Sequence, residues 1–298
     1  TLNLSKQYKN KLVLDKVCMN IKRGDIYGFV GENGSGKTTV IRCVCGLARP
    51  SGGSIELFGT KDTDSKILSE RKKMSAVVET PSIYLNMSAF DNLKMQCDVL
   101  GLKNYDRIEE VLSEVGLAYL SKDHKKAGDF SLGMRQRLGI AMALLSEPEF
   151  MILDEPMNGL DPAGIVDIRE LILKLNRERG ITFLISSHIL TELSLVATKY
   201  GIISKGKLLE EITAEQLHNK CAKTTAISAD DPQKLAEVVR SCVDNQLEYT
   251  SDGVRIIGSL DLNPLLSAVI ADGVKILSIN CSETSFEEYY LSVIGGAK

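Results

Sequence analysis

One eight-residue stretch constrains the fold more than any other part of this chain. It reads Gly-Glu-Asn-Gly-Ser-Gly-Lys-Thr over residues 31–38 and fits the pattern G-x-x-x-x-G-K-[ST] at every fixed position. The apolar segment Ile26 to Val30 before it predicts a strand, and a predicted helix begins near Thr38. In that setting consecutive backbone N–H groups turn towards phosphate oxygens at a helix N-terminus. The stretch therefore predicts a site for the β- and γ-phosphates of a nucleotide.

Three side chains of this stretch have separate predicted tasks. Lys37 adds a point charge on the phosphates, the Thr38 hydroxyl is placed to ligate Mg²⁺, and Thr39 is free to reach the α-phosphate. A glycine-rich turn that binds nothing is the alternative, which the four fixed positions and both flanking elements disfavour. The predicted nucleotide-binding residues are those of this stretch and the residue after it: Gly31, Glu32, Asn33, Gly34, Ser35, Gly36, Lys37, Thr38 and Thr39.

A second predicted strand, Phe150 to Leu153, ends in two acidic residues. Asp154 at the strand end can hold Mg²⁺ through water, while Glu155 projects differently and can polarise an attacking water. Two buried acids side by side are costly without a cation, so a purely structural pair is the weaker alternative. The arrangement is typical of a Walker B motif, the acidic strand-end motif of P-loop nucleotide hydrolases.

Composition excludes several classes of protein. The 298 residues are 44% hydrophobic and 25% charged, which suffices for a large core without disulfides or metals. The net charge of −3 and the lack of a long basic run argue against nucleic acid as the main partner. The seven cysteines are scattered without a C-x-x-C pair, which favours reduced thiols in the cytosol. No run of about 18 apolar residues and no signal segment is found, so we expect no membrane span.

Further motifs complete an ordered series along the chain. Residues 130–134 read Phe-Ser-Leu-Gly-Met before an apolar helical run, residues 158–161 read Asn-Gly-Leu-Asp, and Ser187-His188 follows the predicted strand Ile181 to Ser186. Together with Tyr8 in an early loop and the two motifs above, this order and spacing resembles the ATP-binding-cassette (ABC) ATPases. The resemblance covers Thr1 to about Thr213.

The resemblance implies a role for individual residues at the nucleotide. Tyr8 would stack on adenine, Asp154 would serve the Mg²⁺ shell, Glu155 would be the general base, and His188 would contact the γ-phosphate. Alone, Tyr8 would be read as a packing residue and His188 as a satisfied histidine at a helix start. Their places in the series favour the functional interpretation.

The resemblance also implies that each ATP site is built by two chains. Ser131 and Gly133 would close on the γ-phosphate of the opposite subunit, again as a helix N-terminus facing an anion. Asp161 is expected to contact that ATP in trans as well. Leu132 and Met134 stand where the family usually has glycine and glutamine, but the positions that approach phosphate are kept.

A second departure follows the predicted strand Ser75 to Val78. The loop residue there is Glu79, where the family usually has glutamine. A carboxylate keeps an oxygen for Mg²⁺ and adds charge, so Glu79 is a predicted metal ligand beside Thr38 and Asp154. Alternatively, Glu79 contacts the membrane-spanning partner that the resemblance implies. This residue and the stretch SLGMRQRLGIA resemble the ATPases of lantibiotic and bacitracin self-protection exporters.

The pattern along the chain predicts the fold class. Strands and helices alternate in the manner of an α/β P-loop NTPase with a mainly parallel sheet. Residues 11–21 predict an antiparallel edge, and residues 81–147 a helical insertion that opens with a capping box at Ser88 and Asp91. The stripe Ile108, Val111, Leu112 and Val115 is predicted to be core.

The chain is predicted to change character after residue 212. Residues 213–298 predict a linker helix and a small α+β domain in the order β-α-β-β-α-β, with a helix that Asn263 caps and Gly273 ends. Leu262, Leu265, Leu266, Val269 and Ile270 are predicted to form its apolar face. No residue cluster here suggests catalysis, and a packing or dimer-stabilising module is as well supported as a sensor.

The sequence thus predicts the ATP- and Mg²⁺-dependent ATPase subunit of an ABC exporter for a peptide antibiotic. We expect a dimer, in the cytoplasm on the inner face of the membrane, attached to a separate permease and without a nucleic-acid partner. The alternative is a soluble, non-transport ABC ATPase that acts on nucleic acid or ribosomes. Such proteins usually carry a coiled-coil insertion, zinc modules or tandem cassettes, and this chain has none of these.

Overall fold

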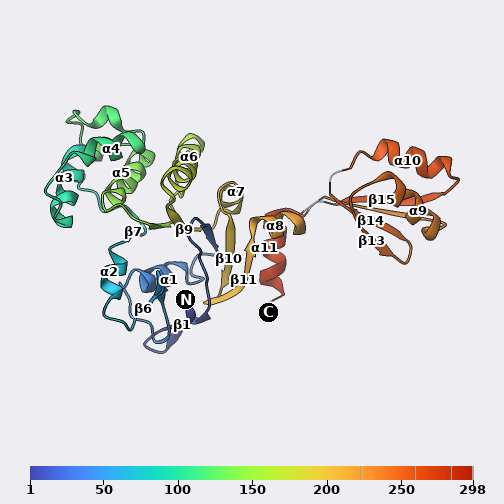
Figure 1. Ribbon diagram of the computed structural model, residues 1–298, viewed down its shortest axis with the longest axis horizontal. Coiled ribbons are helices and arrows are strands. Elements are labelled where there is room, and N and C mark those ends of the chain that lie inside the picture. The colour runs from blue at the N-terminus through green and yellow to red at the C-terminus, as the bar shows by residue number, and fades with distance from the viewer. Residues whose placement is uncertain (222, 259, 283, 297–298) are drawn as a thin grey trace. The chain divides into compact units, whose positions relative to one another are not determined.

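The structure is a computed structural model that describes residues 1–221, 223–258, 260–282 and 284–296. The chain divides into two compact units, residues 1–214 and residues 215–296, and Figure 1 shows both. The first unit contains the phosphate-binding loop and the acidic pair Asp154 and Glu155. Each unit is described by itself below.

A six-stranded sheet forms the centre of the first unit. Its order is β11-β10-β3-β9-β8-β7, and every neighbouring pair is parallel except the β10–β11 hairpin. The inner strands are buried on both faces because helices cover them, which explains why they read as continuous apolar runs. The strands are β3 (Ile26–Val30), β7 (Met74–Val77), β8 (Phe150–Asp154), β9 (Thr182–Ser187), β10 (Lys199–Ser204) and β11 (Lys207–Thr213).

A smaller antiparallel sheet lies at the start of the chain. It consists of β1 (Leu2–Tyr8), β2 (Lys11–Val17) and β4 (Gly52–Ser54) in the order β2-β1-β4. The predicted antiparallel edge is therefore confirmed, although β2 ends four residues before Ile21. A two-stranded ribbon, β5 (Glu56–Leu57) with β6 (Thr60–Lys61), follows it.

Four helices belong to the core of this unit. They are α1 (Lys37–Val44), α2 (Ile67–Arg71), α6 (Pro162–Arg179) and α7 (Leu190–Ser194). Helix α6 begins at Pro162 because Asp161 caps it, accepting a hydrogen bond from the Gly164 N–H at 3.2 Å, and a proline fits its first turn.

The insertion between β7 and β8 is mostly helical, as predicted. It contains α3 (Ala89–Leu100), α4 (Arg107–Glu114) and α5 (Leu132–Leu144), with short 3₁₀ turns at Ala118–Leu120 and Ala127–Asp129. Ser88 caps α3 by accepting a hydrogen bond from the Asp91 N–H. The predicted stripe on and after α4 is buried: Ile108, Val111, Leu112 and Val115. These helices are drawn together in Figure 1, around the N-terminus of α5.

The second unit is a four-stranded antiparallel sheet with helices. Its strands have the order β13-β14-β12-β15, so the predicted β-α-β-β-α-β sequence of elements is confirmed. Leu235, Val239 and Val254 are among the residues of its own hydrophobic core. The elements are α8 (Ala214–Lys220), β12 (Thr224–Ala229), α9 (Pro232–Cys242), β13 (Gln246–Thr250), β14 (Gly253–Ile257), α10 (Leu262–Ala271), β15 (Ile276–Ser282) and α11 (Phe286–Gly295).

Two expectations for α10 were wrong. Asp261 caps this helix by accepting a hydrogen bond from the backbone N–H of Asn263, so Asn263 lies inside the first turn. A carboxylate before the helix competes well for the cap because it accepts the free N–H groups there. Ile270 is 65% exposed and does not belong to the buried face, which Leu265 and Val269 form.

Candidate active site

The phosphate-binding loop lies between β3 and α1, at the carboxyl edge of the parallel sheet. Gly36 precedes the helix with φ of 114°, and a side chain on it would come within 2.8 Å of Leu14 Cδ2. A side chain at Gly31 would collide with the carbonyl oxygen of Ile203. Glycine is therefore required at these two positions by backbone conformation or by close approach. The turn Glu32 to Ser35 is closed by a backbone hydrogen bond of 3.1 Å.

Lys37, the first residue of α1, folds its side chain back over the loop. Its Nζ donates to the Gly31 carbonyl at 2.6 Å and lies 3.3 Å from the Glu32 carbonyl. The residue is only 6% exposed, and its Nζ is 3.3 Å from Glu155 Oε1. The buried ammonium is held by two carbonyls of the loop and by the Glu155 carboxylate, and it can exchange these partners for phosphate oxygens.

Asp154 at the end of β8 connects two elements beside the loop. Its Oδ2 accepts a hydrogen bond of 3.0 Å from Thr38 Oγ1, and its Oδ1 accepts one from Ser186 Oγ on the neighbouring β9. The carboxylate is 2% exposed. A hydroxyl and a carboxylate oxygen in contact are the ligand types that Mg²⁺ takes alongside phosphates and water. The residues present therefore fit a magnesium ion at this point.

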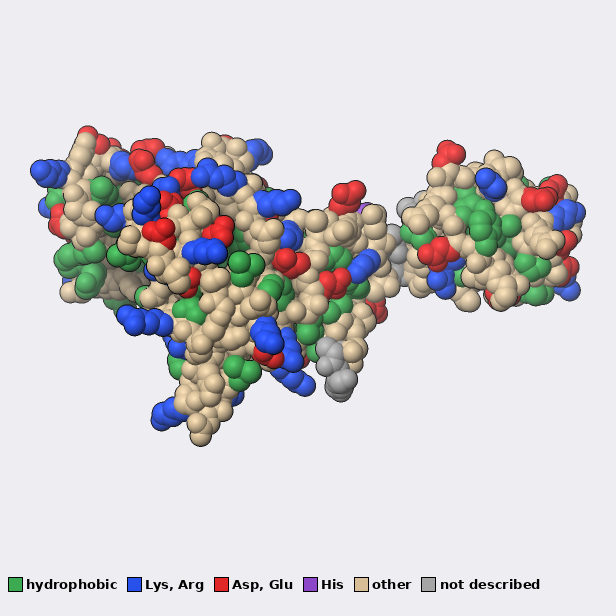
Figure 2. Space-filling model, turned by 60° about the horizontal axis from the view of Figure 1, so that its bottom comes forward, with side chains coloured by type: hydrophobic (Ala, Val, Ile, Leu, Met, Phe, Trp, Pro, Cys, Tyr) green, Lys and Arg blue, Asp and Glu red, His purple; other side chains and the backbone are tan. Residues whose placement is uncertain are grey.

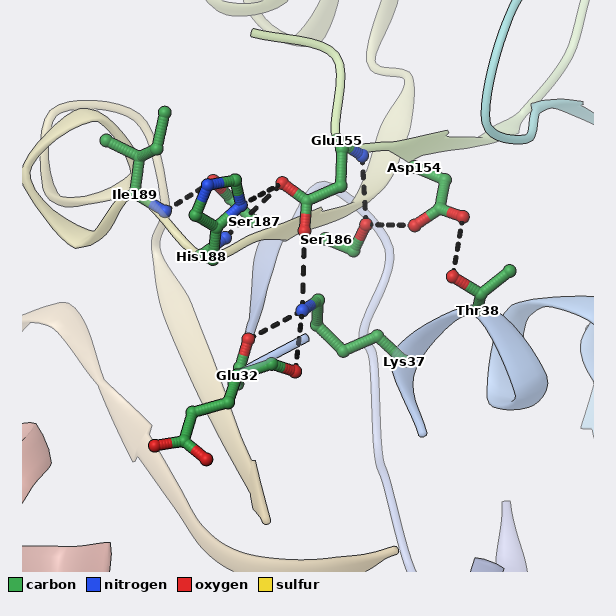
Figure 3. A network of polar contacts seen from close by, with 10 residues as sticks. Glu32, Lys37, Thr38, Asp154, Glu155, Ser186, Ser187, His188 and Ile189 are labelled. Atoms are coloured by element: carbon green, nitrogen blue, oxygen red, sulfur yellow. Dashed lines mark hydrogen bonds and ion pairs between the residues drawn. The ribbon is translucent and has the colours of Figure 1, made fainter. Parts of the chain in front are cut away.

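Glu155 is held in a strained position above Lys37, as Figure 3 shows. Its φ is +53°, an uncommon backbone conformation for a residue other than glycine, and its N–H donates to Ser186 O at 3.1 Å and Oγ at 3.0 Å. His188 Nδ1 lies 2.8 Å from Glu155 Oε2. Glu155 Oε1 is buried and accepts no hydrogen bond from the described residues, and its ion-pair partner Lys37 Nζ lies 3.3 Å away. If Lys37 moves to a phosphate, that oxygen becomes able to accept a proton from a bound water.

Ser131 and Asp161 are the caps of two neighbouring helices. Ser131 Oγ caps α5 by accepting from the Met134 N–H at 3.2 Å, as Asp161 does for α6. A Cβ on Gly133 would lie 3.9 Å from the Cα of Gly164 and from Leu160 Cδ2. The starts of the two helices therefore meet on one surface, where their free N–H groups suit an anion.

Two predicted residues have other partners in the structure. Tyr8 ends β1 with 45% exposure, and Lys6 Nζ lies 4.7 Å from the centre of its ring. Glu79, with φ of +62°, forms an ion pair of 2.7 Å with Arg42 of α1. The polar contacts of the active site thus join Lys37, Thr38, Asp154, Glu155 and His188, whereas Glu79 pairs with Arg42.

Sequence reasoning missed Ser186. Its hydroxyl contacts both Asp154 and Glu155 N, and its carbonyl accepts from Glu155 N, so it aligns the two acidic residues. The only sequence signal is that this serine stands at the end of the predicted strand Ile181 to Ser186, just before Ser187-His188. No group of three or more His, Cys, Asp or Glu residues suited to a metal occurs in the described part of the chain.

Comparison with known proteins agrees with this geometry. The family model described as ABC transporter matches residues 14–158. The bacitracin transport ATP-binding protein BcrA of Bacillus licheniformis is 42% identical over 99% of this chain and 97% of its own length. The chain belongs to the ABC transporter ATP-binding proteins. The lantibiotic transport ATP-binding protein SrtF of Streptococcus pyogenes is also 42% identical, over 70% of this chain and 88% of the relative.

Solved structures agree on the fold of this ABC protein. An ATP-binding subunit of an ABC transporter has a TM-score of 0.63 and 28% identity, over 74% of this chain and 91% of that one. A cassette whose dimer was solved in a post-hydrolysis state with ADP and Pi has a TM-score of 0.63 and 25% identity, over 72% of this chain and 97% of that one. The predicted α/β P-loop fold is therefore confirmed. No helix among the described residues is both long and apolar enough to cross a membrane.

Proposed function

We propose that this ABC ATPase powers the export of a peptide antibiotic through a separate permease. The observation that carries the proposal is the Lys37, Glu155 and His188 cluster directly beside the Thr38–Asp154 pair. The substrate class rests on the near full-length likeness to bacitracin transport proteins and on the likeness to a lantibiotic transport protein. Hydrolysis of ATP supplies the free energy for the conformational change of the permease.

In this proposal the chain's side chains divide the work of phosphoryl transfer. Lys37 leaves the Gly31 carbonyl and binds the β- and γ-phosphate oxygens, while Thr38 and Asp154 hold Mg²⁺. A bound Mg²⁺ neutralises charge on the phosphates. Glu155 accepts the proton of the attacking water at Oε1, and His188 orients Glu155 through Nδ1 and contacts the γ-phosphate. The metal role of Glu79 stays a prediction.

The remaining nucleotide contacts come from the backbone, from Tyr8 and from a second chain. The N–H groups of residues 31–39 surround the phosphates. Tyr8 stacks on adenine after the Lys6 ammonium moves off the face of its ring. Ser131, Gly133 and Asp161 then bind the ATP of the partner subunit. The meeting of the α5 and α6 starts on one surface supports this assignment, and the dimeric relative makes a two-chain site reasonable.

A groove of 1010 Å³ beside the site is a suitable dock for the permease. It is lined by the P-loop helix, the segment after β7, and the insertion helices, including Arg42, Glu79, Gln96, Val99, Leu100 and Met142. Val99 is 73% exposed, so an apolar face is available to a helical segment of the partner. Docking there would hold the ATPase peripherally on the inner face of the membrane.

The two units have different proposed tasks. Residues 1–212 are the ATP-binding domain, with residues 81–147 as its helical subdomain, and residues 213–298 are an accessory domain. A non-transport ABC ATPase acting on nucleic acid is less well supported, because acidic and basic side chains are mixed over the face drawn in Figure 2 and the net charge is −3.

The proposed function is tested by co-expression with a candidate permease. Bacterial cells that carry both genes should survive bacitracin or a lantibiotic better than cells with either gene alone. The matched control replaces Glu155 by Gln, which keeps the shape of the side chain and removes the base. Equal survival of cells with the active and the Glu155→Gln subunit would refute export driven by this ATPase.

A further inference from the structure

The two edges of the four-stranded sheet in the second unit differ in charge. At one edge, β13 carries Glu248, whose Oε2 lies 3.3 Å from Arg255 Nη1 of β14. At the other edge, β15 reads Ile-Leu-Ser-Ile-Asn-Cys-Ser, with neither a charged residue nor a proline. Native proteins usually protect a free edge with such residues, since its unpaired N–H and C=O groups attract another strand. The β15 edge lacks this protection.

An apolar row crosses the sheet and is exposed at both ends, at Tyr249 of β13 (58%) and at Ile279 of β15. Tyr249 pairs with Val254, Val254 with Ile227, and Ile227 with Ile279. Val254 and Ile227 are each 1% exposed, whereas Ile279 at the edge is 37% exposed. Leu277, two residues before it on the same face, is 62% exposed. The hydrophobic layer therefore reaches the edge without being covered there.

Among the described residues, no helix of this unit packs extensively on β15. Helix α9 packs on β14 and β12, and α10 packs on α9, while Ile270 of α10 is itself exposed. Among residues 223–258, 260–282 and 284–296, no strand other than β12 pairs with β15. Figure 2 shows hydrophobic side chains gathered on the surface of this unit. An isolated edge of this kind is a site for strand addition.

We propose that β15 pairs with β15 of a second copy of this chain, antiparallel and centred on Ile279. The two sheets then form one sheet of eight strands. Ile279 lies opposite Ile279 of the partner subunit, and Leu277 lies opposite Cys281 of the partner subunit. The apolar row continues through the interface into the other sheet, which covers the exposed parts of Ile279 and Leu277.

A second copy fits this edge better than another partner because the strand is self-complementary. A two-fold antiparallel pairing brings equal segments together, and a neutral strand meets itself without charge repulsion. On the opposite face, Ser278 lies across from Asn280 of the partner subunit, where hydroxyl and amide can hydrogen-bond. ABC cassettes dimerise, so two copies of this unit are tethered near one another at high effective concentration. The interface requires no nucleotide and is thus separable from the proposed ATP site.

Sedimentation of the full chain without nucleotide tests the pairing. Ile279→Lys should raise the dimer dissociation constant at least tenfold, because it buries a charge beside its own copy. Tyr249→Lys is the matched control, since Tyr249 ends the same row at the other edge, and its dissociation constant should stay within about twofold. ATP binding should be unchanged in both variants. The proposal would be overturned if Ile279→Lys and Tyr249→Lys changed the dimer dissociation constant equally, or if the wild-type chain stayed monomeric.

Cross-linking tests the register and does not depend on a destabilising variant. In a chain whose exposed Cys18, Cys242 and Cys281 are replaced by Ser, Ile279→Cys should cross-link to itself, and Tyr249→Cys should not. Leu277→Cys should cross-link only when Cys281 is retained. The same pattern is expected with Lys37→Ala, which separates this interface from ATP-driven dimerisation. Cross-linking of Ile279→Cys to a co-expressed permease in place of itself would assign the edge to that partner and contradict self-pairing.

Discussion

Arg42 Nη2 lies 2.7 Å from Glu79 Oε1, so the helix that follows the phosphate-binding loop is tied to the loop that follows β7. Both side chains line the groove proposed for the permease. The pair is about half-exposed, and an exposed ion pair contributes only about 0–1 kcal/mol to stability. A partner that fills the groove would remove water from the pair and strengthen it. The contact is therefore suited to link the nucleotide site to the permease.

Breaking this pair should separate hydrolysis from transport. We expect Glu79→Gln and Arg42→Gln to hydrolyse ATP in the isolated subunit within about threefold of the wild-type rate, because the pair is solvent-screened. Stimulation by the permease and antibiotic resistance should fall in both variants. ATPase assays on the subunit and on the assembled transporter measure the two effects.

A metal titration distinguishes the other role of Glu79. If Glu79 ligates Mg²⁺, Glu79→Gln should weaken the apparent Mg²⁺ affinity in the isolated subunit and alter the preference for Mn²⁺ over Mg²⁺. Arg42→Gln serves as the control, since it leaves the carboxylate in place. A loss of metal affinity in Glu79→Gln alone would contradict the permease-linking role as the main one.

Replacing the proposed base should slow the chemical step and spare binding. Glu155→Gln is expected to lower hydrolysis by about 10²–10⁴-fold, with ATP affinity retained and ATP-bound dimers trapped. Lys37→Ala is the matched loss-of-binding variant, because it removes the ammonium that we propose contacts the phosphates. Turnover assays and size-exclusion chromatography with ATP measure both, and near-wild-type turnover of Glu155→Gln would rule out its role as base.

Ser186 is expected to act as a positioning residue. Ser186→Ala removes one hydroxyl that donates to Asp154 and accepts from Glu155 N, so both acidic groups lose alignment. We expect kcat to fall by about tenfold and the unfolding free energy by about 1–3 kcal/mol, since a buried partner is left unsatisfied. Ser186→Thr should recover part of kcat because it keeps the hydroxyl. Unchanged kcat in Ser186→Ala would limit the residue to packing.

The burial of Glu114 between α4 and α6 should make the free energy of unfolding depend on pH. Burial raises the pKa of Glu114 despite Arg179, whose Nη2 lies 2.9 Å from Glu114 Oε1. Because the folded-state pKa exceeds the unfolded one, this group's contribution to stability is present below the unfolded pKa. It is lost as pH rises through the folded pKa. The free energy of unfolding, measured with urea, should decline less between about pH 4 and pH 7 in Glu114→Gln than in wild type. Glu110→Gln is the control. Equal declines in wild type and Glu114→Gln would contradict this assignment.

The sequence predicted those parts of the fold whose signals are local. The glycines around Gly31 and Gly36 stand where backbone crowding or a positive φ demands them, and the continuous apolar strands agree with helices on both faces of a parallel sheet. The cap of α10 was missed because Asp261 and Asn263 are both good capping residues, and the pattern alone does not choose between them.

Contacts between distant segments were beyond sequence reasoning. Ser186 meets Asp154 because β8 and β9 are neighbours in the sheet, and this register is fixed by packing across the whole layer. The Arg42–Glu79 pair depends on how the loop after β7 leaves the sheet. Ile270 has the spacing of a core residue, yet no element of its unit lies over it. Periodicity predicts which side is apolar, and tertiary neighbours decide which residues on it are covered.

Complementation between two inactive subunits tests the two-chain ATP site most directly. Lys37→Ala lacks the lysine of its own phosphate-binding loop, and Ser131→Arg lacks the serine that we propose closes on the partner's ATP. A mixed dimer contains one complete site, so random pairing of equal amounts should restore about a quarter of wild-type ATPase activity. Each variant alone should remain inactive. We expect the mixture to recover activity; a mixture as inactive as its components would rule out an ATP site built by two chains.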